Sequence, residues 1–190
     1  LYSWVMLLLA MNPEWQEKAR VEVLELVAKE GPLDNAKALE RLKLVEMLIM
    51  ETLRLYPPIP IIPRVALKDC YVDHLFIPKG LAVSVHNTVI QHSAEMWGED
   101  ANEFNPGRFA NGSVAACKHP MAFMPFSFGA RACIGRVYSQ VQAKIVVAFL
   151  LQRFRWSMSP DYRHNPIVAG TLVPKNGVPI VLTLLGAKGD

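Results

Sequence analysis

The spacing of apolar residues changes abruptly at Pro57-Pro58, and this change limits the folds open to the chain more than any other feature. Before it, apolar residues recur at helical spacing over residues 36–56, and two consecutive prolines end such a helix. After it, short β-prone runs over residues 59–89 are separated by turn residues such as Pro78-Lys79-Gly80. The two patterns together predict a mainly α-helical chain with small β-sheets, an α+β architecture.

Three further helices are predicted from the same spacing. Residues 1–11 are apolar and helix-compatible. Asn12 and Pro13 suit the N-cap and the first turn of a helix over residues 13–30. Residues 135–155 are helical in pattern and very apolar, so we expect this helix to be buried.

The remaining stretches predict a long loop and a terminal hairpin. Residues 93–132 show weak periodicity and many Gly, Pro and Asn residues, and so long a loop in a compact domain is usually functional. Residues 166–185 predict two strands around a turn at 174–177, where Asn-Gly favours a hairpin.

Composition excludes several classes of protein. Of the 190 residues 52% are hydrophobic, which excludes intrinsic disorder. A net charge of +3 gives no indication of nucleic-acid binding, and we expect none. The three cysteines, Cys70, Cys117 and Cys133, are odd in number and argue against a disulfide framework. No apolar run approaches the ~20 residues that span a bilayer. The chain opens inside an apparent helix without an initiator methionine, so we expect a fragment of a longer protein.

The segment around Cys133 has the most specific chemistry. A glycine-containing loop brings this cysteine to the start of an apolar helix, where N–H groups and the positive end of the helix dipole favour a thiolate. Arg131 adds a positive charge, and Phe126 can shield the sulfur from water. Gly129 and Gly135 allow the backbone close to a flat partner. A lone cysteine is more often a buried structural residue, but the arrangement F-x-x-G-x-R-x-C-x-G favours a thiolate site.

This arrangement resembles the haem-binding loop of the cytochromes P450, and every fixed position matches. In that family the cysteine thiolate is the axial ligand of the haem iron, which implies that role for Cys133. The arginine of the loop binds a haem propionate, a role implied for Arg131. Arg64 matches a second propionate-binding arginine, with an ordinary surface arginine as the alternative. The cofactor implied is haem, and its implied binding residues are Arg64, Phe126, Gly129, Arg131, Cys133 and Gly135.

A second constellation joins an acid and two arginines. Glu51 and Arg54 are three residues apart and share a helix face, and such a pair on a surface contributes only a few tenths of a kcal/mol. Here the pair lies on an apolar helix and resembles the P450 E-x-x-R motif. Residues 104–109 resemble the F-x-P-x-R-F segment, whose arginine, here Arg108, completes a buried network. One carboxylate facing two guanidiniums requires carbonyl acceptors nearby. The network is expected to support folding and haem retention.

Substrate contacts are implied only by position. In P450s the loop after the E-x-x-R helix and a turn near the C-terminus face the distal pocket, and here these are residues 59–63 and 167–170. The implied contacts are Ile59, Ile61, Ile62 and Val168. Their apolar character suits a lipophilic substrate, with ordinary core packing as the alternative. His92 is expected to be a structural hydrogen-bonding residue rather than an iron ligand.

The resemblance covers essentially the whole chain and implies one partial domain, the C-terminal part of a P450 fold. The oxygen-activating acid and alcohol pair is expected upstream of Leu1, so no catalytic residue is assigned. The implied segments are the end of the long distal helix (1–11), helices up to E-x-x-R (12–56), a β-rich region (57–92), the meander and haem-thiolate loop (93–135), the proximal helix (135–155) and a C-terminal β-hairpin region (156–190).

The activity implied is that of a haem-thiolate monooxygenase that hydroxylates a small lipophilic substrate, such as a hormone-like terpenoid or steroid. It would use O2 and electrons from NADPH-cytochrome P450 reductase. The chain is most similar to plant P450s of the group with cytokinin, gibberellin and brassinosteroid hydroxylases. That group implies the cytosolic face of the endoplasmic reticulum membrane, with an anchoring segment that this chain does not contain.

Two alternatives remain open. The 190-residue chain is expected to be inactive alone, and it would then be a truncated, non-catalytic haem-binding or interaction fragment. A haem-thiolate isomerase or dehydratase is a minor alternative, because those relatives often alter the haem loop and this loop is unaltered.

Overall fold

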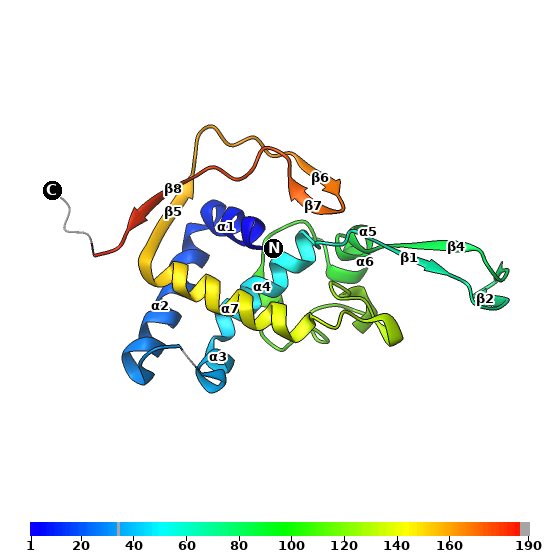
Figure 1. The fold of residues 1–190 in the computed structure, drawn as a ribbon, viewed down its shortest axis with the longest axis horizontal. Coiled ribbons are helices and arrows are strands. Elements are labelled where there is room, and N and C mark those ends of the chain that lie inside the picture. The colour runs from blue at the N-terminus through cyan, green and yellow to red at the C-terminus, as the bar shows by residue number, and fades with distance from the viewer. Residues whose placement is uncertain (34, 187–190) are drawn as a thin grey trace.

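Helices form the body of the molecule, as the computed structural model of residues 1–33 and 35–186 shows (Figure 1). The α-helices are α1 (Tyr2–Met11), α2 (Pro13–Glu30), α3 (Ala36–Arg41), α4 (Lys43–Leu55), α5 (Asn87–Gln91), α6 (Ala94–Trp97) and α7 (Arg136–Arg153). Short 3-10 helices are η1 (Pro106–Phe109), η2 (Pro120–Ala122) and η3 (Gly129–Arg131). The segment expected over 156–190 ends in residues 187–190, which lie outside the described residues.

Within the described residues the strands pair into four two-stranded antiparallel sheets. They are β1 (Ile61–Val65) with β4 (Ala82–His86), β2 (Cys70–Val72) with β3 (Leu75–Ile77), β5 (Phe154–Met158) with β8 (Ile180–Leu184), and β6 (Pro166–Ala169) with β7 (Thr171–Pro174). The β1–β4 pair projects from the helices as an arm with β2 at its far end (Figure 1). The mixture of helices with small sheets confirms the α+β prediction.

Helix α4 lies at the centre of the core, where it contacts α1, α2, α7 and η1. Its side chains Val45, Leu48, Ile49 and Leu53 are each at most 2% exposed. Full burial of one such side chain stabilises the folded state by about 1.5–3 kcal/mol. A helix this deeply buried is a rigid platform for polar residues on its last turn.

A buried polar cluster joins α2 to the end of α7 and the start of β5. The guanidinium of Arg20 donates from Nη1 to the carbonyl oxygens of Leu151 and Phe154, and from Nη2 to Oε1 of Gln16 at 2.9 Å. The Gln16 side chain also exchanges hydrogen bonds with the backbone of Trp156, at 2.9 and 3.1 Å. Arg20 is only 3% exposed. Two side chains of α2 thereby satisfy backbone groups at the junction where α7 ends and β5 begins.

The helix expected over residues 36–56 is interrupted at Leu42, so α3 and α4 are separate. The cause is a long-range cap on α4: the carboxylate of Glu22, on α2, accepts hydrogen bonds from the backbone N–H groups of Leu44 and Val45 at 2.7 and 3.0 Å. These first-turn N–H groups have no partner within their own helix. The side chain of Asn12, expected to cap α2, instead donates to the carbonyl of Leu8 at 2.8 Å.

The turn expected at residues 174–177 is present, since the backbone N–H of Gly177 donates to the carbonyl of Pro174 at 3.0 Å, but the hairpin expected around it is wrong. Strands β6 and β7 pair with each other through Gly170, whose φ of +73° suits a tight turn, and β8 pairs with β5 instead. A two-residue turn at Asn176-Gly177 would place Pro174 opposite Pro179. Neither proline has an N–H to donate, so that ladder would lose its second pair.

Helix α7 is buried on one face only, contrary to the prediction. Ala143, Val147 and Leu151 lie in the core, whereas an apolar stripe on the other side is exposed. That α7 stripe comprises Val137, Val141, Ile145 and Phe149. None of the helices within residues 1–33 and 35–186 combines the length and the apolar character needed to cross a bilayer.

Candidate functional site

The carboxylate of Glu51 and the guanidinium of Arg54 form a buried bidentate ion pair on the last two turns of α4. Nε of Arg54 lies 2.7 Å from Oε2 of Glu51, and Nη2 lies 2.8 Å from Oε1. Both side chains are fully buried. The i, i+3 spacing places them on one face, and the apolar helix carries that face into the core. Parallel N–H···O bonds between charged groups are strong and directional.

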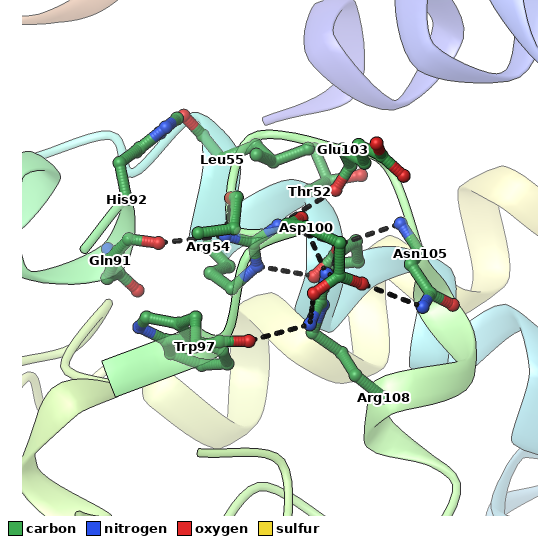
Figure 2. A network of polar contacts seen from close by, with 12 residues as sticks. Thr52, Arg54, Leu55, Gln91, His92, Trp97, Asp100, Glu103, Asn105 and Arg108 are labelled. Atoms are coloured by element: carbon green, nitrogen blue, oxygen red, sulfur yellow. Dashed lines mark hydrogen bonds and ion pairs between the residues drawn. The ribbon is translucent and has the colours of Figure 1, made fainter. Parts of the chain in front are cut away.

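The remaining donors of Arg54 bind the backbone at the end of α5 and in the loop expected to follow the β-rich region. Nη1 donates to the carbonyls of Gln91 at 2.8 Å and Ala101 at 2.5 Å, and Nη2 donates to the carbonyl of Glu103 at 3.0 Å. Figure 2 shows Gln91 and Glu103 beside the guanidinium of Arg54. The ring of Trp97 lies 5.1 Å from the guanidinium carbon. Carbonyl acceptors were expected here, because one carboxylate alone cannot satisfy two guanidiniums.

Arg108, in η1, connects a second segment of that loop to the same carboxylate. Its Nε lies 3.2 Å from Oε1 of Glu51, and the backbone N–H of Asn105 donates to the same oxygen at 2.8 Å. Nη1 of Arg108 also donates to the carbonyl of Trp97 at 3.3 Å (Figure 2). The structure therefore brings Glu51, Arg54 and Arg108 together.

Asp100 is a further member that sequence reasoning missed. Its Oδ2 accepts from Nη2 of Arg108 at 2.8 Å and from Nδ2 of Asn105 at 3.2 Å. These hydrogen bonds, first that of Arg108, hold the pKa of Asp100 below its usual value. With Asp100 the network contains two carboxylates and two guanidiniums, so its formal charges balance. The signal available in the sequence was an acid eight positions before Arg108.

His92 and Asn87 tie adjacent loops to this region. The ring of His92 bonds through Nε2 to the carbonyl of Leu55 at 3.0 Å and through Nδ1 to Oδ1 of Asn102 at 2.8 Å, as the expected structural hydrogen-bonding role requires. The fully buried Asn87 donates from Nδ2 to the carbonyl of Met124 at 3.2 Å and to that of Ile59 at 3.4 Å. Sequence reasoning had no signal for Asn87.

A cluster of packed aromatic rings connects the buried network to the start of the cysteine-bearing loop. The ring of Phe109, next to Arg108, lies 6.0 Å from that of Trp97 and 5.0 Å from that of Phe123. Phe123 leads directly into the turn where the backbone N–H of Ser127 donates to the carbonyl of Met124 at 3.1 Å. Because these rings are packed in the core, displacement of η1 would displace the start of the loop.

Cys133 lies exposed between η3 and the first turn of α7. Its backbone N–H donates to the carbonyl of Phe126 at 2.9 Å, which folds the loop back on itself. Phe126 is half-buried against the core. Gly129 has a φ of +74°, a conformation that side chains rarely adopt. At Gly135 an added Cβ would lie 3.8 Å from the Cys133 sulfur, in ordinary contact.

The two candidate propionate-binding arginines lie on different elements. Arg64 is exposed on β1, where Nη1 donates to the carbonyl of Pro63 at 3.0 Å and Nη2 donates to the hydroxyl of Ser127 in the loop. Arg131 is exposed in η3, two residues before Cys133. The structure thus brings Arg64 to the same loop that carries Arg131 and the cysteine.

The four candidate substrate contacts differ in exposure. Ile59, Ile61 and Val168 are exposed, whereas Ile62 is only 7% exposed and belongs to the core. Burial at Ile62 favours ordinary core packing there. The carbonyl of Ile59 is linked through Asn87 to Met124, so this loop and the cysteine-bearing loop are held by one side chain.

The residues around Cys133 fit a haem. No three His, Cys, Asp or Glu side chains gather to hold a metal ion in the part of the chain that the structure describes. A single exposed thiol suits an iron whose other ligands come from a porphyrin, and Arg64 and Arg131 suit its carboxylates. The positive φ of Gly129 favours glycine, and the missing side chain leaves the loop backbone uncovered there for a flat group.

The comparison with protein families agrees with this site. The profile described as Cytochrome P450 matches residues 2–183. The chain therefore belongs to the cytochrome P450 family, whose cofactor is haem.

Its relatives include several plant proteins. The chain is 44% identical over 182 residues to a "Cytokinin hydroxylase" of Arabidopsis thaliana, which covers 96% of this chain and 35% of that protein. It is also 44% identical, over 96% of its length, to an "11-oxo-beta-amyrin 30-oxidase" of Glycyrrhiza uralensis, and it covers 34% of that protein. The same identity and the same 96% are found with "Cytochrome P450 714C3" of Oryza sativa subsp. japonica, of which it covers 35%. The chain thus spans about a third of the length of these relatives.

Proposed function

We propose that this chain is the C-terminal, haem-binding part of a haem-thiolate monooxygenase. The observation that carries the proposal is the exposed Cys133 at the start of α7, in a loop that is held from two sides. Arg64 reaches the loop from β1, and the buried network holds the segment that precedes it. A structural cysteine would be expected inside the core rather than on an open face.

In this proposal the thiolate of Cys133 ligates the iron, and the N-terminal end of α7 stabilises its negative charge. Arg64 and Arg131 bind the two propionates. Phe126 keeps water from one side of the sulfur, and Gly129 and Gly135 allow the loop to approach the porphyrin. When bound, the haem supplies the binding and activation of O2.

The buried network is proposed to position the loop rather than to take part in chemistry. Glu51 and Arg54 both lie on the rigid α4: Arg54 donates to the carbonyls of Gln91, Ala101 and Glu103, and Glu51 accepts from the backbone N–H of Asn105. Removal of one partner from a buried ion pair typically costs about 3–5 kcal/mol. Such a loss would loosen residues 93–135 and weaken haem retention.

The whole enzyme would insert one oxygen atom of O2 into a small lipophilic substrate, with two electrons from NADPH-cytochrome P450 reductase and release of the second atom as water. Ile59, Ile61, Ile62 and Val168 are proposed to contribute to an apolar pocket. The relatives' names, "Cytokinin hydroxylase" and "11-oxo-beta-amyrin 30-oxidase", support a hormone-like or terpenoid substrate. We propose that a segment outside this chain attaches the enzyme to the cytosolic face of the endoplasmic reticulum.

A second candidate function is that of a non-catalytic haem-binding or interaction fragment. The α7 stripe favours it, because four apolar side chains on one helix face are open to a partner. A non-catalytic haem-binding fragment would also hold haem at Cys133 and would differ from the first candidate only in turnover, whereas an interaction fragment requires no haem.

The test is an absorption spectrum of the 190-residue chain mixed with hemin, reduced and saturated with carbon monoxide. We expect the red-shifted Soret band of a thiolate-ligated haem, absent in Cys133→Ser. Cys70→Ser is the matched control, because Cys70 is also exposed but lies in β2. A wild-type band that persists in Cys133→Ser, or no such band at all, would contradict the proposal.

A further inference from the structure

Ser127 adopts a backbone conformation that serine rarely accepts. Its φ is +62°, in the left-handed region where glycine is favoured. Its backbone N–H closes a turn with the carbonyl of Met124 at 3.1 Å. Gly129, two residues later, also has a positive φ, and there the chain does have a glycine. Because the loop has a glycine at its other positive-φ position, the serine at 127 requires a reason in its side chain.

The side chain supplies one: the hydroxyl of Ser127 accepts a hydrogen bond from Nη2 of Arg64. Nη1 of the same guanidinium donates to the carbonyl of Pro63 at 3.0 Å. A guanidinium carries five N–H groups in a planar fork, so two bonds in one plane fix its orientation and leave donors for a carboxylate. The two residues are 63 positions apart, and the bond therefore joins the β-arm to the cysteine-bearing loop.

We propose that Ser127 is a positioning residue for the cofactor: its hydroxyl holds the Arg64 guanidinium at the angle at which it binds a carboxylate of the porphyrin. This inference rests on the proposed function, since it requires haem at Cys133. A left-handed serine persists only where its surroundings determine the conformation, and such strain is typical of ligand sites. The strain is retained because glycine, which would relieve it, has no hydroxyl.

Substitutions of Ser127 are expected to affect the thermal stability of the apoprotein and the retention of haem differently. If Ser127 had only a structural role, the two would change together. In Ser127→Gly the backbone relaxes and the hydroxyl is lost, so the apoprotein should unfold at the same or a higher temperature while haem is retained less well. Ser127→Ala loses the hydroxyl and keeps the strain, so both properties should fall. Ser127→Asn restores an acceptor in a residue that tolerates this φ, so it should recover most of the haem retention.

The experiment measures the rate at which the hemin-loaded chain loses haem to excess apomyoglobin, with thermal unfolding of each apoprotein as the second readout. We expect Ser127→Gly to lose haem about tenfold faster, the scale of one hydrogen bond to a charged group. Arg64→Ala should lose haem at least as fast, and the double variant should be no faster than Arg64→Ala, since both changes remove one interaction.

Two results would overturn the inference alone: haem loss from Ser127→Gly at the wild-type rate, or additive effects of the two changes. A wild-type hemin complex whose spectrum is independent of Cys133, or no complex, would instead overturn the proposed function and this inference with it. The Cys133→Ser spectrum is therefore recorded first, so that the two failures are distinguished.

Discussion

Two buried arginines, Arg54 and Arg20, are satisfied in different ways. Arg54 is fully buried and faces the equally buried carboxylate of Glu51. Arg20 is 3% exposed, but its buried acceptors are neutral: two backbone carbonyls and the amide of Gln16. An acidic neighbour, Glu17, lies 3.2 Å away with its side chain half exposed.

The difference shows what each cluster requires. Removing Glu51 would leave a guanidinium in the core without its counter-charge, whereas Glu17 shares its charge with water. At the Arg20 cluster the critical group is the neutral amide of Gln16, which satisfies three backbone groups from two segments, those of Leu9 in α1 and Trp156 in β5. The α4 cluster therefore depends on charge, and the α2 cluster depends on hydrogen-bond geometry.

The largest effect is expected for Glu51→Gln. The substitution keeps the shape of the side chain and removes the buried negative charge, so the free energy of unfolding should fall by about 3–5 kcal/mol. Urea denaturation followed by circular dichroism measures the change. A loss below about 1 kcal/mol would mean that the backbone carbonyls alone compensate Arg54.

A smaller loss is expected for Gln16→Leu, which removes the amide and keeps a similar volume. The freed backbone groups of Leu9 and Trp156 and one donor of Arg20 lose their partner, at a cost of about 1–3 kcal/mol. The same denaturation experiment checks it. A cost equal to that of Glu51→Gln would remove the distinction between the two clusters.

The contribution of the Asp100 carboxylate to stability should be visible in the pH dependence of the free energy of unfolding. Its hydrogen bonds with Arg108 and Asn105 lower its folded-state pKa below the usual value of 3.8. Its contribution is therefore fully present above that value and is lost as the pH falls through the lower, folded-state pKa. Unfolding free energies measured from pH 6 down to about pH 2 should decline less steeply in Asp100→Asn than in the wild type. Parallel curves would contradict this linkage.

The smallest effect is expected for Glu17→Gln. The exposed carboxylate contacts Arg20 and Arg155, and surface ion pairs contribute at most about 1 kcal/mol. The loss should shrink further at high salt. A salt-independent loss would show that Arg20 relies on this acid as Arg54 relies on Glu51.

The contrast also explains what could be predicted from the sequence. The spacing of Glu51 and Arg54 is local, so the pattern alone placed them on one helix face, and the bounds of α2 followed from Pro13 and Gly31 in the same way. The partners of Gln16 and Arg20 at the end of α7 and in β5 lie more than 130 residues away, and no local pattern indicates them.

The other differences between the sequence-based predictions and the structure also come from contacts between residues that are far apart in the sequence. The break in the helix at Leu42 accompanies a cap on α4 from Glu22, which lies on another helix. Strand β8 pairs with β5, which is separated from it in sequence by β6 and β7. Asp100 and Ser127 escaped notice because their roles depend on a loop conformation and on a positive φ, neither of which residue spacing determines.

The central claim is that the network around Glu51, and not the cluster around Gln16 and Arg20, holds the haem-binding loop in place. The reduced, carbon monoxide-bound spectrum of the hemin-loaded chain is compared between Glu51→Gln and Gln16→Leu, at a temperature where both variants are folded. We expect Gln16→Leu to retain the Cys133-dependent Soret band and Glu51→Gln to lose most of it. Equal bands in the two variants would contradict the claim that the network around Glu51 positions the cysteine-bearing loop.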